Sequence, residues 1–117
     1  RDKILDIIET GTKQFQMVLF SIIELVERSK ISKKNTSNIV HTGDIFEYYE
    51  QLCVRSKIDC LTHRRVGDII AELDMLGLIS TRVISKGRHG RMREIRLVIP
   101  DTILSKSRFI LVESLGA

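Results

Sequence analysis

The sequence predicts an α+β fold that is mainly helical and carries one small antiparallel β-hairpin. In several segments, apolar residues recur at three- and four-residue spacing, which is typical of amphipathic helices. Two strand-like runs, residues 80–85 and 93–99, follow the last strongly periodic helix directly. A tip rich in glycine and arginine joins these runs. A helix that leads straight into a basic β-hairpin is typical of a winged helix-turn-helix, a fold that reads nucleic acids.

The composition is that of a folded domain of modest size. The 117 residues are enough for one core, and we expect residues 1–117 to form a single winged-helix domain. Apolar residues make up 43% and charged residues 29%, as in ordinary globular proteins. Only 5% of the residues are aromatic, which argues against the binding of single strands through stacked bases. No apolar run approaches the ~18 residues of a membrane span, and no signal peptide is visible.

The N-terminal part is predicted to support the helix and hairpin. A short apolar helix over residues 2–9 ends at Gly11, and it is too short to stand alone. It must therefore dock on another element or continue from a preceding domain. The chain begins at Arg1 in sequence of mid-helix character, so we interpret it as a fragment of a longer protein. A second helix, with a core-forming stripe, is expected over about residues 12–28.

Residues 28–43 form a polar connection that is long for a loop in a compact domain. Within it, Ile39 and Val40 are candidates for a short first strand that adds to the hairpin. Two readings of its lysines remain open: contact with a DNA backbone, or a solvated loop. A third helix is expected to begin at Thr42 as its N-cap and to end near Lys57. Its predicted buried residues are Ile45, Tyr49, Leu52 and Cys53.

The helix before the hairpin is expected to start at the N-cap Thr62 and to end at Gly77 in a left-handed conformation. Its predicted buried residues are Val66, Ile69, Ile70, Leu73 and Leu76. Its opposite side carries Arg64, Gly67, Asp68 and Ala71. Small residues let a helix lie close to a groove wall, and N–H groups at a helix start suit a phosphate. Because Asp68 and Glu72 oppose deep burial of the middle of the helix in DNA, we expect the first two turns to read the bases.

The return strand, residues 93–99, alternates core and solvent positions as a half-buried antiparallel strand does. Its predicted core positions are Ile95, Leu97 and Ile99. We expect residues 87–92 to form the turn, with arginines projecting outward, and Pro100 to stop the strand. Met92 is expected to pack on the sheet, with a wedge between bases as the alternative. Residues 101–115 predict a last helix that packs on the second helix or offers a partner surface.

The positive charge is concentrated in the hairpin. Residues 82–96 hold five arginines, one lysine and one acid, so this segment carries +5 and the remainder −1 of the net +4. A basic stripe confined to one element is typical of a phosphate-binding surface. The alternative is a charged sheet edge that prevents aggregation between strands.

The sequence offers no constellation for catalysis or metal binding. It has two cysteines, three scattered histidines and no CxxC pair, which argues against a zinc site. Cys53 and Cys60 are therefore expected to be small core residues. There is no GxxxxGK[ST] phosphate loop, and Asp68, Glu72 and Asp74 are interpreted as a solvated helix face. We predict that this chain is not an enzyme and uses no cofactor.

From Leu61 onward the sequence carries the motifs of a known family. They are Thr62-x-Arg64-Arg65-Val66, Glu72-Leu73-Asp74-Met75-Leu76-Gly77 and Ser85-x-Gly87-Arg88-x-Gly90-Arg91, preceded by Thr42-Gly43-Asp44-Ile45-Phe46-x-x-Tyr49. With these motifs, roughly residues 1–99 resemble the C-terminal winged-helix domain of the archaeal origin-recognition (cell-division-control type) replication initiators.

The resemblance implies recognition of duplex DNA at a replication origin, with the recognition helix in the major groove and the wing in the minor groove. The implied recognition-helix residues are Thr62, His63, Arg64 and Arg65, and the outer face of the helix adds Asp68 to the candidate site. The implied wing residues are Arg88, His89, Gly90 and Arg91, and the basic tip of the hairpin adds Lys86, Gly87 and Arg93 to the candidate site. His63 stands where many members have glutamine, and His89 where an aromatic residue is common.

The resemblance also implies an AAA+ ATPase module before this domain in the full-length parent, with residues 1–11 as a linker helix from it. That ATPase activity does not transfer to this chain. The implied partners are origin DNA and the replicative helicase or other initiator proteins, with no membrane and no metal, in a cytoplasmic, nucleoid-associated protein. Two other functions remain open: a winged-helix transcription regulator, and a protein-interaction module whose basic wing meets an acidic partner.

Overall fold

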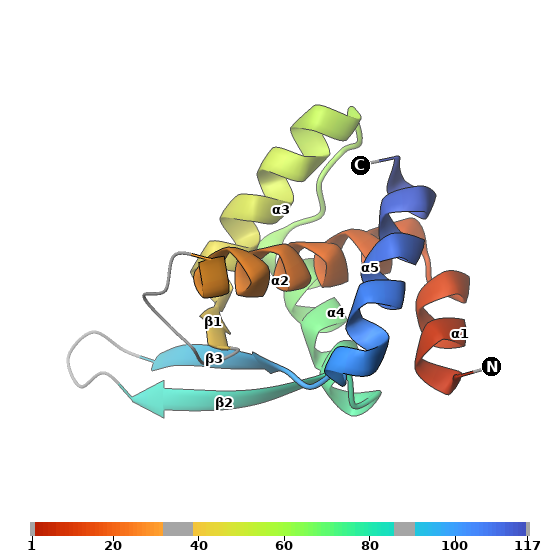
Figure 1. Ribbon diagram of the computed structural model, residues 1–117. Coiled ribbons are helices and arrows are strands. Elements are labelled where there is room, and N and C mark those ends of the chain that lie inside the picture. Colours follow the sequence, from red (N-terminus) through yellow and green to blue (C-terminus); the bar gives the residue numbers. More distant parts are fainter. Residues whose placement is uncertain (1, 32–38, 86–90, 117) are drawn as a thin grey trace.

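The computed structural model describes residues 2–31, 39–85 and 91–116, and in these ranges the order of elements matches the predicted class. The elements are α1 (Lys3–Thr10), α2 (Lys13–Ile31), β1 (Ile39–His41), α3 (Thr42–Ser56), α4 (His63–Met75), β2 (Ile79–Ser85), β3 (Arg91–Leu97) and α5 (Asp101–Leu115). Figure 1 shows α2 across the middle of the molecule, with the sheet at one end of the helices and α5 crossing α2.

The longest helix, α2, forms the centre of the core. Its residues from Phe15 to Ile23 are all buried, which is the pattern of a helix covered on every side. It packs against α3, α4, α5, β1 and β3. The helix continues to Ile31, three residues beyond the predicted end at Arg28, and Ile31 is 79% exposed. The polar connection therefore begins later than predicted, because the last turn of α2 extends past the core.

The sheet has the order β1-β3-β2, and both strand pairs are antiparallel. Ile39 pairs with Arg96, which confirms the predicted short first strand. The hairpin ladder runs from Ile79, opposite Leu97, to the far end of β2. Ile95 and Leu97 are buried as predicted, and Ile99 follows them into the core.

The turn between the hairpin strands is shorter than predicted. Arg91 and Met92 belong to β3, because they continue the ladder opposite Ser85 and Ile84. The assignment of these two residues to the turn was wrong. Regular pairing extends the strand beyond the point where alternation in the sequence becomes visible.

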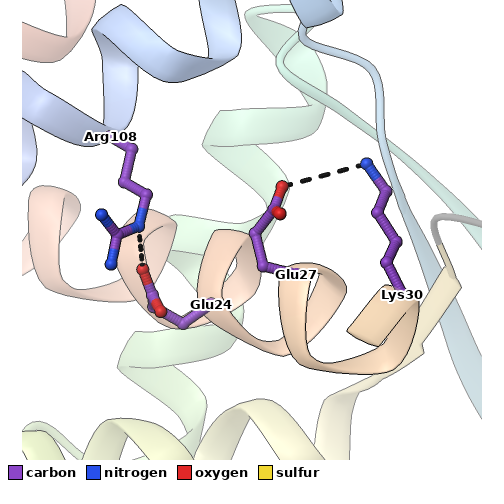
Figure 2. Close-up of polar contacts among 4 residues, drawn as sticks. All are labelled: Glu24, Glu27, Lys30 and Arg108. Carbon is purple, nitrogen blue, oxygen red and sulfur yellow. Dashed lines mark hydrogen bonds and ion pairs between the residues drawn. The ribbon is translucent and has the colours of Figure 1, made fainter. Parts of the chain in front are cut away.

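The two outer helices, α1 and α5, pack on each other beside α2 (Figure 1). The predicted helix over residues 101–115 is confirmed, and it packs on α2 as one of the two predicted alternatives. Its buried residues are only Leu104, Ser107 and Leu111, which explains its weak periodicity. In Figure 2, Arg108 of α5 donates from Nε to a Glu24 carboxylate oxygen of α2 at 2.6 Å. A looser pair, Glu27 with Lys30, lies one turn further along α2 at 3.9 Å.

The start of α3 differs from the prediction. His41, the last residue of β1, occupies the N-cap position without a side-chain capping bond, and Thr42 is the first helical residue. The chain therefore passes from strand to helix without a separate capping residue, because pairing of His41 with Glu94 fixes the strand up to that point. The predicted end is confirmed: Lys57 caps the helix in the left-handed conformation, with φ of 57°.

Two residues predicted to be buried are exposed. Leu76 is 42% exposed because it follows the last residue of α4, where the chain leaves the core. Cys60 is exposed in the segment between α3 and α4, whereas Cys53 is buried as predicted. Gly77 adopts a φ of +80°, which confirms the predicted left-handed termination.

Candidate nucleic-acid interface

The N-terminus of α4 is built by the capping residue that the sequence predicts. Thr62 is extended, and its hydroxyl accepts a hydrogen bond from the backbone N–H of Arg65 at 3.2 Å. Its carbonyl accepts from the N–H of Val66 at 3.0 Å, which closes the first helical turn. The helix therefore starts at His63 and carries Arg64 and Arg65 in its first turn.

Both arginines project from the helix start into solvent. Arg64 and Arg65 are exposed, and among the residues that the structure describes neither has an acidic partner within ion-pair distance. Their positive charge adds to the positive end of the helix dipole. The result is two guanidinium groups without an acidic partner among the described residues, at the positive end of a helix, an arrangement that suits a phosphate or the edge of a guanine.

His63 lies against α3. Its ring stacks on the Phe46 ring with centroids 4.1 Å apart and an angle of 7° between the planes. Its Nε2 lies 3.6 Å from a carboxylate oxygen of Glu50. Sequence reasoning missed both partners, although Phe46 and Glu50 are four residues apart and so share a face of α3. The imidazole is thus held at the side of the helix start, next to the two arginines.

Further along α4, the outer face carries small and acidic residues. Asp68 and Ala71 are exposed, and Glu72 is exposed one turn on, as the interpretation of a solvated face predicted. A Cβ added to Gly67 would meet nothing within 4 Å, so internal packing does not require glycine there. Because glycine has no Cβ, the backbone of α4 is accessible at this position, which permits close approach by an external surface.

The described arginines of the hairpin lie on both faces of the sheet. Arg82 and Arg96 are on the solvent face with Glu94. The Glu94 Oε1 atom lies 3.9 Å from the Arg82 Nε. These residues line a shallow hollow together with Ile39 and Ser80. Sequence reasoning counted both arginines in the basic stripe but did not place them in the site.

The remaining wing residues of the predicted site are only partly described. Arg93 pairs in register with Val83 on the other face of the hairpin and is half-buried. Arg91 begins β3. The predicted contacts at Lys86, Gly87, Arg88, His89 and Gly90 lie outside the described residues.

No other chemistry emerges from the described part of the chain. Residues 2–31, 39–85 and 91–116 contain no group of three or more histidine, cysteine or acidic side chains placed to hold a metal ion. None of the described helices combines the length and hydropathy that crossing a bilayer requires.

A helix with a capped, cationic start, followed directly by a basic hairpin that pairs with a short earlier strand, defines a winged-helix domain. The chain belongs to the family described as the CDC6 C-terminal winged helix domain, whose model matches residues 6–107. The resemblance noted in the sequence is thereby confirmed, as is the fold class.

Curated relatives are archaeal replication proteins. The chain is 40% identical over 112 residues to an ORC1-type DNA replication protein 1 of Methanosarcina mazei, covering 96% of this chain and 25% of that protein. It is 41% identical over 112 residues to an ORC1-type DNA replication protein 4 of Haloarcula marismortui, covering 92% and 20%. The chain thus spans a fifth to a quarter of the length of these relatives and corresponds to their winged-helix part.

Solved structures with the same fold include a relative bound to DNA. The Orc1 protein of Aeropyrum pernix, solved in complex with DNA, is 32% identical with a TM-score of 0.78, covering 96% of this chain and 26% of that chain. Cdc6p from Pyrobaculum aerophilum has a TM-score of 0.70, covering 96% of this chain and 26% of that chain. Its identity of 15% supports a shared fold alone.

Proposed function

We propose that this chain binds duplex DNA sequence-specifically, as the origin-recognition domain of an archaeal-type replication initiator. The observation that carries the proposal is the start of α4, where Arg64 and Arg65 are exposed beside a capped helix N-terminus. Membership of the replication-initiator family supports the proposal, and so does the DNA complex of the Aeropyrum pernix relative.

The proposed contacts divide into two kinds. Phosphate contacts from Arg64, Arg93 and the wing cations Lys86, Arg88 and Arg91 supply most of the affinity. The first turns of α4 supply base readout in the major groove, where Thr62, His63 and Arg65 are also proposed to make contact. Asp68, which was predicted as part of this face, lies at the end of the first two turns of α4, to which we assign base readout. No metal or cofactor is needed for either kind of contact.

The first prediction concerns salt. With about four to six phosphates neutralised, a plot of log affinity against log salt concentration should have a slope of roughly −4 to −5. The measurement is titration of a labelled duplex at several salt concentrations, followed by fluorescence anisotropy. A slope near zero would show that phosphate contacts do not carry the binding.

The second prediction concerns specificity. Replacing Arg64 with alanine should weaken binding to the preferred duplex by about 1–3 kcal/mol, the discrimination of one bidentate contact to guanine. Affinity for random duplex should fall less, so the specificity ratio should shrink. Lys106→Ala is the matched control, because Lys106 is an exposed cation on α5, away from α4. Equal affinities for Arg64→Ala and Lys106→Ala would remove Arg64 from the interface.

A second candidate function is protein binding without a DNA role. It is favoured by the exposed Asp68 and Glu72 and by Met75, which is 84% exposed, further along α4. Acids on the outer face of the helix oppose contact with phosphates, and in this alternative the basic wing meets an acidic partner surface. A gel shift with random duplex at low and high salt separates the two candidates, because the protein-binding module would leave the duplex unshifted at both.

The activities of the whole parent protein are further proposals. We propose that the parent carries an AAA+ ATPase module before this domain, acts at the nucleoid and contacts the replicative helicase or other initiators. Family membership supports this placement, since the relatives are about four to five times as long as the matched segment.

A further inference from the structure

Residues 57–61, between α3 and the capping residue Thr62, are tied to the core although they form neither helix nor strand. The backbone N–H of Leu61 donates to the Tyr49 hydroxyl of α3 at 2.8 Å. The carbonyl of Asp59 accepts from the Gln14 amide nitrogen of α2 at 3.3 Å. The segment is thus held by side chains of two helices, at Asp59 and at Leu61, immediately before the capping residue Thr62.

The two side chains that hold the segment also bind each other. The Tyr49 hydroxyl donates to the Gln14 amide oxygen at 2.6 Å while it accepts from Leu61. The Tyr49 ring is buried, with 1% of its surface exposed, so it cannot change position without disturbing the core. Burial also raises the pKa of Tyr49 to about 12, so the hydroxyl stays protonated and continues to donate at neutral pH.

We propose that Tyr49 and Gln14 position the DNA-reading start of α4. Leu61 directly precedes the N-cap, so fixing its N–H fixes the point from which Thr62, His63 and the first-turn arginines depart. The idea rests on the proposed function and adds positioning residues that make no contact with DNA. Base readout needs side chains placed within about 0.5 Å, and a preorganised segment also loses less entropy when DNA binds.

Hydrogen exchange tests the contact without DNA. Tyr49→Phe keeps the ring and removes the hydroxyl, so the Leu61 amide should exchange roughly two- to tenfold faster than in the parent. Tyr48→Phe is the matched control: Tyr48 is the neighbouring buried tyrosine of α3, and its ring lies near the Arg28 guanidinium, 4.9 Å from the ring centre. In this control, exchange at Leu61 should be unchanged. Equal exchange at Leu61 in the parent and Tyr49→Phe would overturn the proposal.

DNA binding tests the consequence. Tyr49→Phe should lower affinity for the preferred duplex roughly two- to tenfold, while the salt slope stays that of the parent because no phosphate contact is lost. The titration is run well below the melting temperature of each variant, so that a merely structural loss does not enter. Unchanged affinity, or a reduced slope, would overturn the positioning role.

Gln14→Leu gives a second route if Tyr49→Phe fails to fold, because Gln14 is only half-buried on α2. It should also speed exchange at Leu61 and weaken DNA binding. Failure of the proposed function looks different: the parent itself would not bind duplex. The exchange comparison would still report whether Tyr49 holds Leu61 in place.

Discussion

Replacing Leu73 with alanine is expected to lower the free energy of unfolding by about 2–5 kcal/mol. Leu73 is completely buried on the inner face of α4, which also carries the buried Val66 and Ile70, and α4 packs against β2. The change removes three buried carbons and leaves a cavity that packed neighbours fill only in part. Because small domains are stable by only about 5–15 kcal/mol, this one side chain accounts for a large share of the total.

Denaturant unfolding followed by circular dichroism measures the effect. Met75→Ala is the matched control on the same helix, since Met75 is 84% exposed, and its free energy of unfolding should stay within about 0.5 kcal/mol of the parent. Leu73→Ala should still bind duplex at temperatures where it is folded, because Leu73 has no solvent-facing surface. Similar stability losses in the two variants would contradict the assigned inner face of α4.

The sequence predicted α4 well because its boundaries and faces depend on local chemistry. The Thr62 hydroxyl satisfies an N–H of the first turn, and Gly77 takes a positive φ, and both effects follow from residue type alone. Val66, Ile70 and Leu73 of the predicted apolar stripe are buried as their spacing predicts, whereas Ile69 is only half-buried. In the same way, alternation in the return strand placed Ile95 in the core.

Tertiary pairing decided the positions that the sequence predicted wrongly. His41 replaces Thr42 at the start of α3 because a strand pair fixes the preceding residues. Arg91 and Met92 lie in β3 because the ladder continues opposite β2. Cys60 has an apolar neighbour in Leu61, yet it is exposed, because the segment before α4 is held to the core through the backbone of Asp59 and Leu61. Hydrophobic periodicity carries no information about any of these pairings.

In the candidate site, too, the local features were predicted from the sequence, and the contacts between distant elements were not. The cationic helix start was visible in the sequence because Arg64 and Arg65 follow a capping residue directly. The contacts that orient it were not visible, because Phe46 and Tyr49 reach it from α3 across the fold. A buried tyrosine does require a partner for its hydroxyl, and that requirement was the available signal. The individual DNA contacts stay predictions until binding is measured.

Raising the pH above 10 is expected to destabilise the fold through Tyr49. Its pKa rises from 10.0 to about 12 in the folded protein, mainly because burial disfavours the phenolate. Below pH 10 the hydroxyl is protonated in both the folded and unfolded chain, so its full contribution is present. Between pH 10 and about 12 only the unfolded chain loses the proton, which costs up to about 1.4 kcal/mol of stability for each pH unit.

Comparison with Tyr49→Phe isolates this single group. Phenylalanine cannot ionise, whereas every other ionisable side chain is common to both proteins. The free energy of unfolding, measured in denaturant at pH 8, 10 and 11, should therefore fall more steeply in the parent. The difference in free energy of unfolding between parent and variant should therefore shrink as pH rises, because only the parent contains a Tyr49 hydroxyl that ionises in its unfolded chain. A difference between the two proteins that is constant with pH would show that the Tyr49 hydroxyl is not in the buried, hydrogen-bonded position that orients α4.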